Sequence, residues 1–172
     1  FWLTFLLKNI KNFARDLILI FFSKLIFIKK DYFYNCENCF HSYYYNFVQK
    51  KNTCRDRLYE NAPYVKKKDK NFYIISLHKI RKIELKNLNL KYVIQEKYLK
   101  VFQLLNIYLV TLASLVKLIF FLNSKKNLFF INGVNCENIL KPLLIESFSG
   151  FIQFSLINAQ SINNILKKNK NL

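Results

Sequence analysis

The side chains best suited to chemistry are three cysteines and a histidine in the first third of the chain. Cys36 and Cys39 form a Cys-x-x-Cys pair, His41 follows closely, and Cys54 comes later. Such a pair brings two thiolates within reach of one tetrahedral metal ion, and a third cysteine with a histidine completes a Cys₃His set for zinc. Because only one Cys-x-x-Cys pair is present, unliganded structural cysteines are the alternative. The residues leave both interpretations open.

Catalysis has little support in the rest of the sequence. His41 and His78 are the only histidines, and ten acidic residues are spread over 172 positions. The chain contains neither a glycine-rich phosphate loop nor a nucleophile elbow. We therefore expect a protein that is not an enzyme and has no small-molecule substrate.

The charge of the chain predicts an anionic partner. Twenty-eight Lys and Arg against ten Asp and Glu leave a net charge of +18, while 52% hydrophobic residues exclude a simple disordered polycation. Nucleic acid offers the densest array of phosphates for lysines to neutralise. An anionic membrane surface, an acidic protein and an ordinary solvated basic face are the alternatives.

Amino-acid usage points to an organelle. Phe, Tyr, Ile, Leu, Asn and Lys are abundant, Met is absent, and Gly and Pro occur twice each. This bias is typical of translation from a very AT-rich genome, as in an organelle-encoded or protist protein, and it favours lysine at positions where other genomes encode arginine. A mitochondrial protein of the matrix is the first expectation, with another organelle as the alternative.

The elements that must position these residues follow from apolar spacing. Residues 1–30 predict an amphipathic helical extension, and residues 31–95 form a basic region that contains the cysteines. Residues 99–122 are apolar for long enough to span a bilayer. Lys117 argues against that span, because a lysine inside it costs about 3 kcal/mol. Two shorter helices, broken near residues 106–111, use the same apolar side chains without this cost.

A β-hairpin is predicted at Asn132-Gly133. Ordinary usage predicts roughly a dozen glycines in a chain of this length, so one of only two glycines is expected where the backbone needs a positive φ. Asn-Gly between apolar residues is a strong hairpin signal. A turn is expected at Lys141-Pro142. Residues 147–172 then predict a strand over 148–157 and a basic tail.

Residues 96–146 resemble the RNA-binding module of the small-subunit ribosomal protein S-four family, which pseudouridine synthases and tyrosyl-tRNA synthetases share. The similar stretches are Glu96–Lys100, Val101–Ile107, Thr111–Ile119, Phe130–Gly133 and Lys141–Ile145. The chain departs from the family pattern where Lys100 stands opposite an aspartate, Leu112 and Val116 opposite arginines, and Leu143-Leu144 opposite Gly-Asp.

The resemblance implies an α+β fold, with a helical N-terminal region followed by a small helix-helix-hairpin module. It implies a structural constituent of an organellar small ribosomal subunit that binds and organises rRNA and meets neighbouring ribosomal proteins. The RNA-facing candidates are Lys97, Lys100, Lys117, Lys125, Lys126 and Lys141. Bacterial members of the family can carry a cysteine zinc site, which agrees in order with Cys36, Cys39 and Cys54.

The alternative function is a membrane-embedded subunit of an organellar respiratory or ATP synthase complex. In that case residues 99–122 would be the transmembrane helix, and the basic segments would lie outside the bilayer. Only under this alternative is the membrane a partner.

Overall fold

A computed structural model of the chain describes eight segments: residues 2–26, 38–43, 47–50, 53–56, 71–77, 91–125, 128–148 and 150–168. They belong to two compact units. The helical unit comprises Phe1–Leu17 and Lys100–Gln160, and the sheet unit comprises Ile18–Leu99 and Ser161–Leu172. Helices predominate and a small sheet accompanies them, so the expected α+β class is confirmed at this level.

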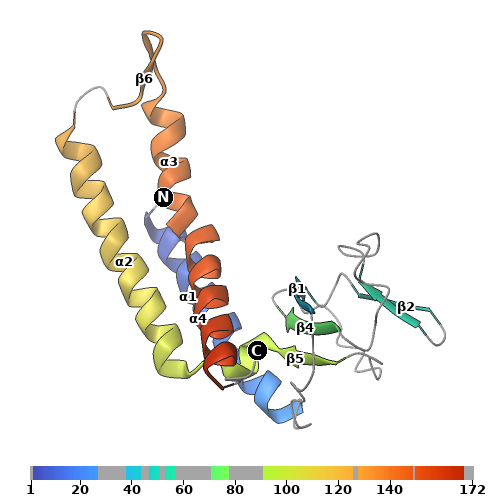
Figure 1. Ribbon diagram of the computed structural model, residues 1–172. Coiled ribbons are helices and arrows are strands. Elements are labelled where there is room, and N and C mark those ends of the chain that lie inside the picture. Colours follow the sequence, from blue (N-terminus) through green and yellow to red (C-terminus); the bar gives the residue numbers. More distant parts are fainter. Residues whose placement is uncertain are drawn as a thin grey trace. The chain divides into compact units, whose positions relative to one another are not determined.

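The helical unit is built from four helices and a short hairpin (Figure 1). They are α1 (Trp2–Ile26), α2 (Val101–Ser124), the hairpin of β6 (Phe130–Ile131) and β7 (Val134–Asn135), α3 (Glu137–Phe148) and α4 (Phe151–Lys168). Both α1 and α4 continue into the sheet unit. In Figure 1, α2 and α3 lie side by side, and the hairpin stands at the end where they are joined.

One narrow apolar stripe holds these helices together. The buried residues of α2 recur mostly at three- and four-residue steps, as expected for one face of a helix: Leu104, Ile107, Thr111, Leu115 and Leu122. Leu115 packs with Phe5 of α1 and Ile145 of α3 in a single cluster. Helices α1, α2 and α3 therefore each contribute one face to this core, and most of the remaining surface of α2 is exposed.

The sheet unit contains a parallel three-stranded sheet. Its strands are β1 (Asn38–Tyr43), β4 (Asn71–Ser76) and β5 (Tyr92–Ile94), in the order β1-β4-β5. Every residue of β4 is buried, which is typical of a central parallel strand with both faces covered. A separate antiparallel pair joins β2 (Phe47–Lys50) and β3 (Thr53–Asp56).

The last turns of α4 cover one face of this sheet. Ile165 packs with Phe72, Ile74 and Val93, which project from the same side of β4 and β5. After β5 the chain enters the 3-10 helix η4 (Gln95–Tyr98). There Glu96 Oε1 accepts hydrogen bonds from Ser76 Oγ at 2.8 Å and from the Leu77 backbone N–H at 2.7 Å.

The N-terminal helix and the hairpin agree with prediction. Helix α1 covers residues 2–26 of the expected 1–30. The hairpin turns at Asn132 and Gly133, whose φ angles are +50° and +81°. Two consecutive left-handed residues are typical of the type I′ turn that Asn-Gly favours. The positive φ predicted for Gly133 is therefore confirmed.

Three secondary-structure predictions were wrong. Helix α2 is continuous instead of broken near residues 106–111, and the buried Thr111 hydroxyl is satisfied within it by donating to Ile107 O at 2.9 Å. Lys141-Pro142 lies within α3 instead of forming a turn. This helix starts earlier, where Asn135 Oδ1 accepts from the Glu137 backbone N–H at 2.9 Å.

The third wrong prediction is the C-terminal strand, because residues 151–168 form α4. Its buried positions recur every four residues and include two polar side chains: Gln153, Ile157, Ser161 and Ile165. A search for apolar periodicity misses such a face, since half of it is polar.

Candidate nucleic-acid interface

Three of the lysines predicted to face RNA lie along α2, and all three are exposed. Lys100 caps the start of the helix, Lys117 lies within it, and Lys125 follows its last residue. At 1.5 Å per residue, Lys100 and Lys117 are about 25 Å apart along the axis, whereas Lys117 and Lys125 are about 12 Å apart. The helix therefore distributes these charges along its length, with the closer pair towards the hairpin.

Lys141 lies at that same end of the helical unit. Its Nζ donates to Asn123 Oδ1 at 2.8 Å and lies 3.4 Å from Glu137 Oε1. The contact with Asn123 ties α3 to the last turn of α2. Lys125, Lys141 and the hairpin thus share one end of the helical unit, which we call the hairpin end.

The remaining two predicted lysines are placed differently. Lys97 belongs to the sheet unit, in η4, where it is half-buried. Lys126 lies outside the described residues.

The structure shows two of the four candidate zinc ligands with their side chains. Cys39 and His41 lie two residues apart on β1 and therefore on the same face of that strand. Cys39 is exposed, and His41 Nε2 lies 2.6 Å from Gln95 Oε1. Cys36 lies outside the described residues, and β3, which contains Cys54, is described by its backbone alone. Among the side chains described, no three His, Cys, Asp or Glu residues come together. Zinc stays a prediction.

A buried acid on α1 is a site that the sequence did not single out. Asp16 is 8% exposed, and its Oδ1 pairs with Arg15 Nη2 at 2.7 Å. Its Oδ2 accepts a hydrogen bond from the Tyr108 hydroxyl of α2 at 2.9 Å. Burial, together with the nearby Asp16 carboxylate, raises the pKa of the Tyr108 phenol above its ordinary value. The phenol therefore keeps its proton and acts as the donor in this pair.

A second polar contact lies on the same side of α1, two helical turns earlier. Gln153 of α4 is 4% exposed, and its Nε2 donates to Asn9 Oδ1 at 2.7 Å. Thr111 Oγ1 lies 3.4 Å from the same Gln153 nitrogen. Asn9 in turn donates to Phe5 O at 2.9 Å. These contacts fix the register of α1 against α2 and α4, because a shift of one helix would leave buried polar atoms without partners.

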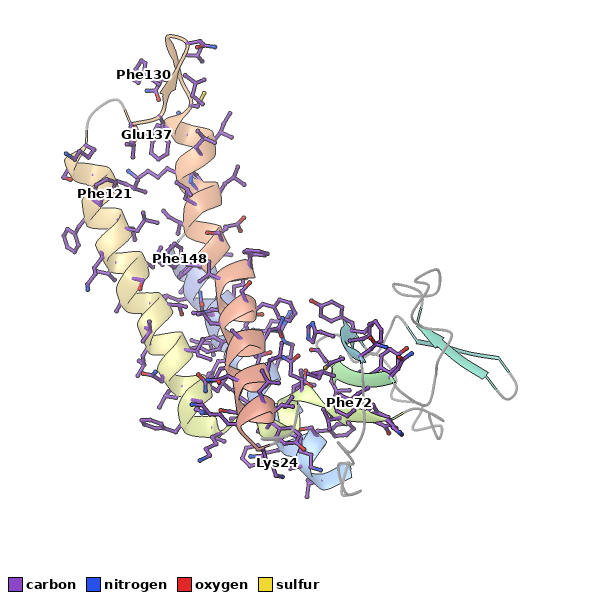
Figure 2. The ribbon with its side chains drawn as sticks, viewed as in Figure 1. Lys24, Phe72, Phe121, Phe130, Glu137 and Phe148 are labelled. Carbon is purple, nitrogen blue, oxygen red and sulfur yellow. The ribbon has the colours of Figure 1, made fainter. Side chains whose placement is uncertain are left out.

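The outer surface of the helical unit is strongly apolar. Phe102 and Phe120 of α2 are 77% and 73% exposed. Figure 2 shows Phe121 near the end of α2 and Phe130 on the hairpin, and each is 49% exposed. By length and composition, two helical stretches could cross a membrane: Val101–Ser124, and Glu137–Lys168, which runs through a residue outside the described part. Helices in the cores of soluble proteins pass the same test.

Comparison of the chain with protein-family models, with curated proteins and with solved structures gives no match. Interpretation of this surface therefore rests on the chain's own residues and geometry.

Proposed function

We propose that the protein is a structural constituent of the small subunit of an organellar ribosome, of the mitochondrial type, where it binds and organises rRNA. The hairpin at Asn132-Gly133 is the observation that carries this proposal. It has the left-handed turn that the resemblance to the ribosomal S-four family calls for, and it directly follows a lysine-flanked helix in a chain with a net charge of +18.

The hairpin end supplies chemistry suited to an RNA backbone. Lys125 is exposed, and the ammonium group of Lys141 is held at the end of α2 by its hydrogen bond to Asn123 Oδ1. Double-stranded RNA is recognised mainly by its shape, phosphates and 2′-hydroxyls, because side chains cannot read its deep and narrow major groove. Lysines on a rigid support can therefore position rRNA without reading its sequence. This role requires no catalytic group.

The uninterrupted α2 changes how such a module would work. The family pattern has two helices before its hairpin, whereas this chain has a single helix of 24 residues. In our proposal the RNA contacts therefore lie towards the ends of α2. The apolar side chains between them, such as Phe102 and Leu109, would meet neighbouring ribosomal proteins.

A membrane-embedded subunit of an organellar respiratory or ATP synthase complex is the second candidate, and α2 is the observation that favours it. Twenty-four helical residues extend about 36 Å, enough to cross a hydrocarbon core of about 30 Å. Lys117 argues against this role, because inserting a lysine into the middle of a membrane span costs about 3 kcal/mol. It lies seven residues before the helix end, about 10 Å, so its side chain could reach towards the headgroups.

Fractionation of the source organelle separates the two candidates. Membranes are washed with high salt and with alkaline carbonate, and the chain is followed beside a known small-subunit protein and a known integral membrane subunit. The ribosomal proposal expects the chain to sediment with the small subunit and to leave it as salt rises. Retention in carbonate-washed membranes, together with the integral marker, would exclude the ribosomal proposal and support the second candidate.

A further inference from the structure

The hairpin of β6 and β7 carries exposed apolar side chains on both of its faces. Ile131 and Val134 are cross-strand partners on one face and are 53% and 62% exposed. Phe130, the neighbour of Ile131 in the strand, lies on the opposite face and is 49% exposed. These side chains contribute little to the chain's own core. A grouped set of exposed apolar side chains beside charged residues is typical of an interaction site.

The face that carries Phe130 also has a hydrogen-bond donor. Phe130 pairs across the hairpin with Asn135, and such partners share a face with Cβ atoms about 4.5–5.5 Å apart. Asn135 Oδ1 accepts from the Glu137 backbone N–H at 2.9 Å, so this oxygen is occupied in starting α3. The exposed amide Nδ2 of Asn135 is then left to donate to a ligand. This face combines a flat ring with adjacent N–H donors.

The hairpin holds this ring on a fixed support. Phe129, directly before it, is only 9% exposed, and its carbonyl oxygen accepts from the Cys136 backbone N–H at 3.0 Å. At the other end of the two strands, Asn132 and Gly133 form the left-handed turn. Because the strands are fixed at both ends, a ligand that meets the Phe130 ring orders little additional backbone.

The charge around the hairpin is positive even when every acid nearby is counted. Between positions 123 and 144 the sequence contains three lysines, Lys125, Lys126 and Lys141, and one acid, Glu137. Glu137 Oε1 lies 3.4 Å from Lys141 Nζ and offsets one of these charges. The remaining balance favours a ligand that carries both a flat apolar group and a negative charge.

We infer that Phe130 stacks on an unpaired RNA base, and that Asn135 Nδ2 donates to an acceptor on the edge of that base. Bases in loops and bulges are recognised by stacking on aromatic side chains, and their own phosphates bring the charge that lysines bind. An apolar protein surface would match Ile131 and Val134, but it offers no acceptor to Asn135 and no charge to the lysines. The inference rests on the proposed function and names the part of the rRNA that meets the hairpin end.

Binding of the full chain to two RNA probes tests the inference. One probe is a stem-loop with an unpaired loop, and the other is the same stem as a closed duplex. We expect Phe130→Ala to weaken binding of the stem-loop about 5- to 150-fold, as for the loss of one base–aromatic stack, and to leave duplex binding unchanged. Ile131→Ala is the matched control, because it shortens a side chain of similar exposure on the opposite face, and it should leave both affinities unchanged.

A conservative variant and a direct measurement accompany this comparison. Phe130→Tyr keeps an aromatic ring and should bind the stem-loop like the wild type. Circular dichroism verifies that each variant is folded. If Phe130→Ala does not fold, ultraviolet crosslinking of the wild-type chain to a stem-loop with 5-iodouridine in its loop still decides, since the crosslink should form at Phe130.

Unchanged stem-loop affinity in Phe130→Ala, an equal loss for the duplex, an equal loss in Ile131→Ala, or crosslinking only at other residues would overturn the inference. Each of these results can occur in a chain that sediments with the small subunit, so the proposed function would survive them. A selective loss in a chain that never sediments with ribosomes would support stacking and exclude the proposed function. Wild-type binding to vesicles of anionic phospholipid, without binding to the stem-loop, would overturn both.

Discussion

The Tyr108 hydroxyl donates a 2.9 Å hydrogen bond to Asp16 Oδ2, which joins α2 to α1 across 92 residues of sequence. Phe13 packs edge-on against the same tyrosine ring, at 5.1 Å between the ring centres. The carboxylate is buried, and Arg15 balances its charge. This contact specifies which turn of α1 meets which turn of α2.

Loss of the phenol hydroxyl should therefore destabilise the helical unit. We expect Tyr108→Phe to lower the free energy of unfolding by about 1–3 kcal/mol, because Asp16 Oδ2 would be left buried without this donor. Unfolding in urea, followed by circular dichroism, measures the change. Ser124→Ala is the control, since its exposed hydroxyl bonds to Phe121 O of its own helix, and about 0.5 kcal/mol or less is expected. Equal stability of Tyr108→Phe and wild type would contradict a specifying role for the pair.

The same pair predicts a loss of stability in alkali. The pKa of Tyr108 is raised in the folded chain, so above the ordinary tyrosine pKa of about 10 the unfolded chain releases a proton that the folded chain retains. The unfolded state then binds fewer protons, and the free energy of unfolding falls as pH rises. The wild-type protein should lose stability more steeply above pH of about 10 than Tyr108→Phe does. Parallel curves for the two proteins would show that the phenol is not responsible.

The turn at Gly133 should resist substitution for conformational reasons alone. Its φ is +81°, and a Cβ added there would have nothing within 4 Å. We expect Gly133→Val to cost more than about 1 kcal/mol, because a β-branched residue is strained at positive φ. Thermal unfolding measures this cost. Gly150→Ala is the control, because its added Cβ would lie at an ordinary 4.0 Å from Glu146 O.

Neutral substitutions at the hairpin end should weaken attachment to the ribosome. We expect Lys125→Gln with Lys141→Gln to release the chain from small subunits at lower salt than wild type, because two phosphate contacts are lost. Sedimentation across a salt series provides the measurement. Glu137→Gln removes the acid near Lys141 and should shift release to higher salt or leave it unchanged. If the lysine variant leaves the small subunit at the same salt concentration as the wild type, the hairpin end does not contact the rRNA.

The zinc expectation can be examined at Cys39. If Cys36, Cys39, His41 and Cys54 hold zinc, Cys39→Ser should remove the metal from the purified chain and destabilise the sheet unit, because structural zinc contributes directly to folding. Metal content and thermal unfolding are measured on the same samples, with Cys136→Ser as the control. Unchanged stability without any bound zinc in the wild-type chain would leave unliganded cysteines as the explanation.

Features encoded over short distances were predictable. The helical state of α1 depends on residues within one or two turns of one another, and the turn at Asn132-Gly133 depends on adjacent residues. A type I′ turn needs positive φ at two consecutive positions, and Asn-Gly satisfies this without tertiary support.

Features that depend on distant partners were not predictable. Gln153 and Ser161 look like surface residues, yet both are buried in α4, and Gln153 finds Asn9 on another helix. Thr111 and Asn106 look like helix breakers, yet α2 continues through them. Neither the hydrogen bond between Asp16 and Tyr108 nor the cation–π contact of Lys168 with the Tyr98 ring leaves a periodic pattern in the sequence.

The sequence by itself determined the strong positive charge, the helical state of residues 2–26 and the left-handed hairpin turn, because composition and local backbone preference decide all three. Tertiary structure alone decided the identity of the buried polar side chains, the helical state of residues 151–168 and the contact of Lys168 with the Tyr98 ring. The physical reason is that a polar side chain is buried only where a partner satisfies it, and such partners come from remote parts of the chain.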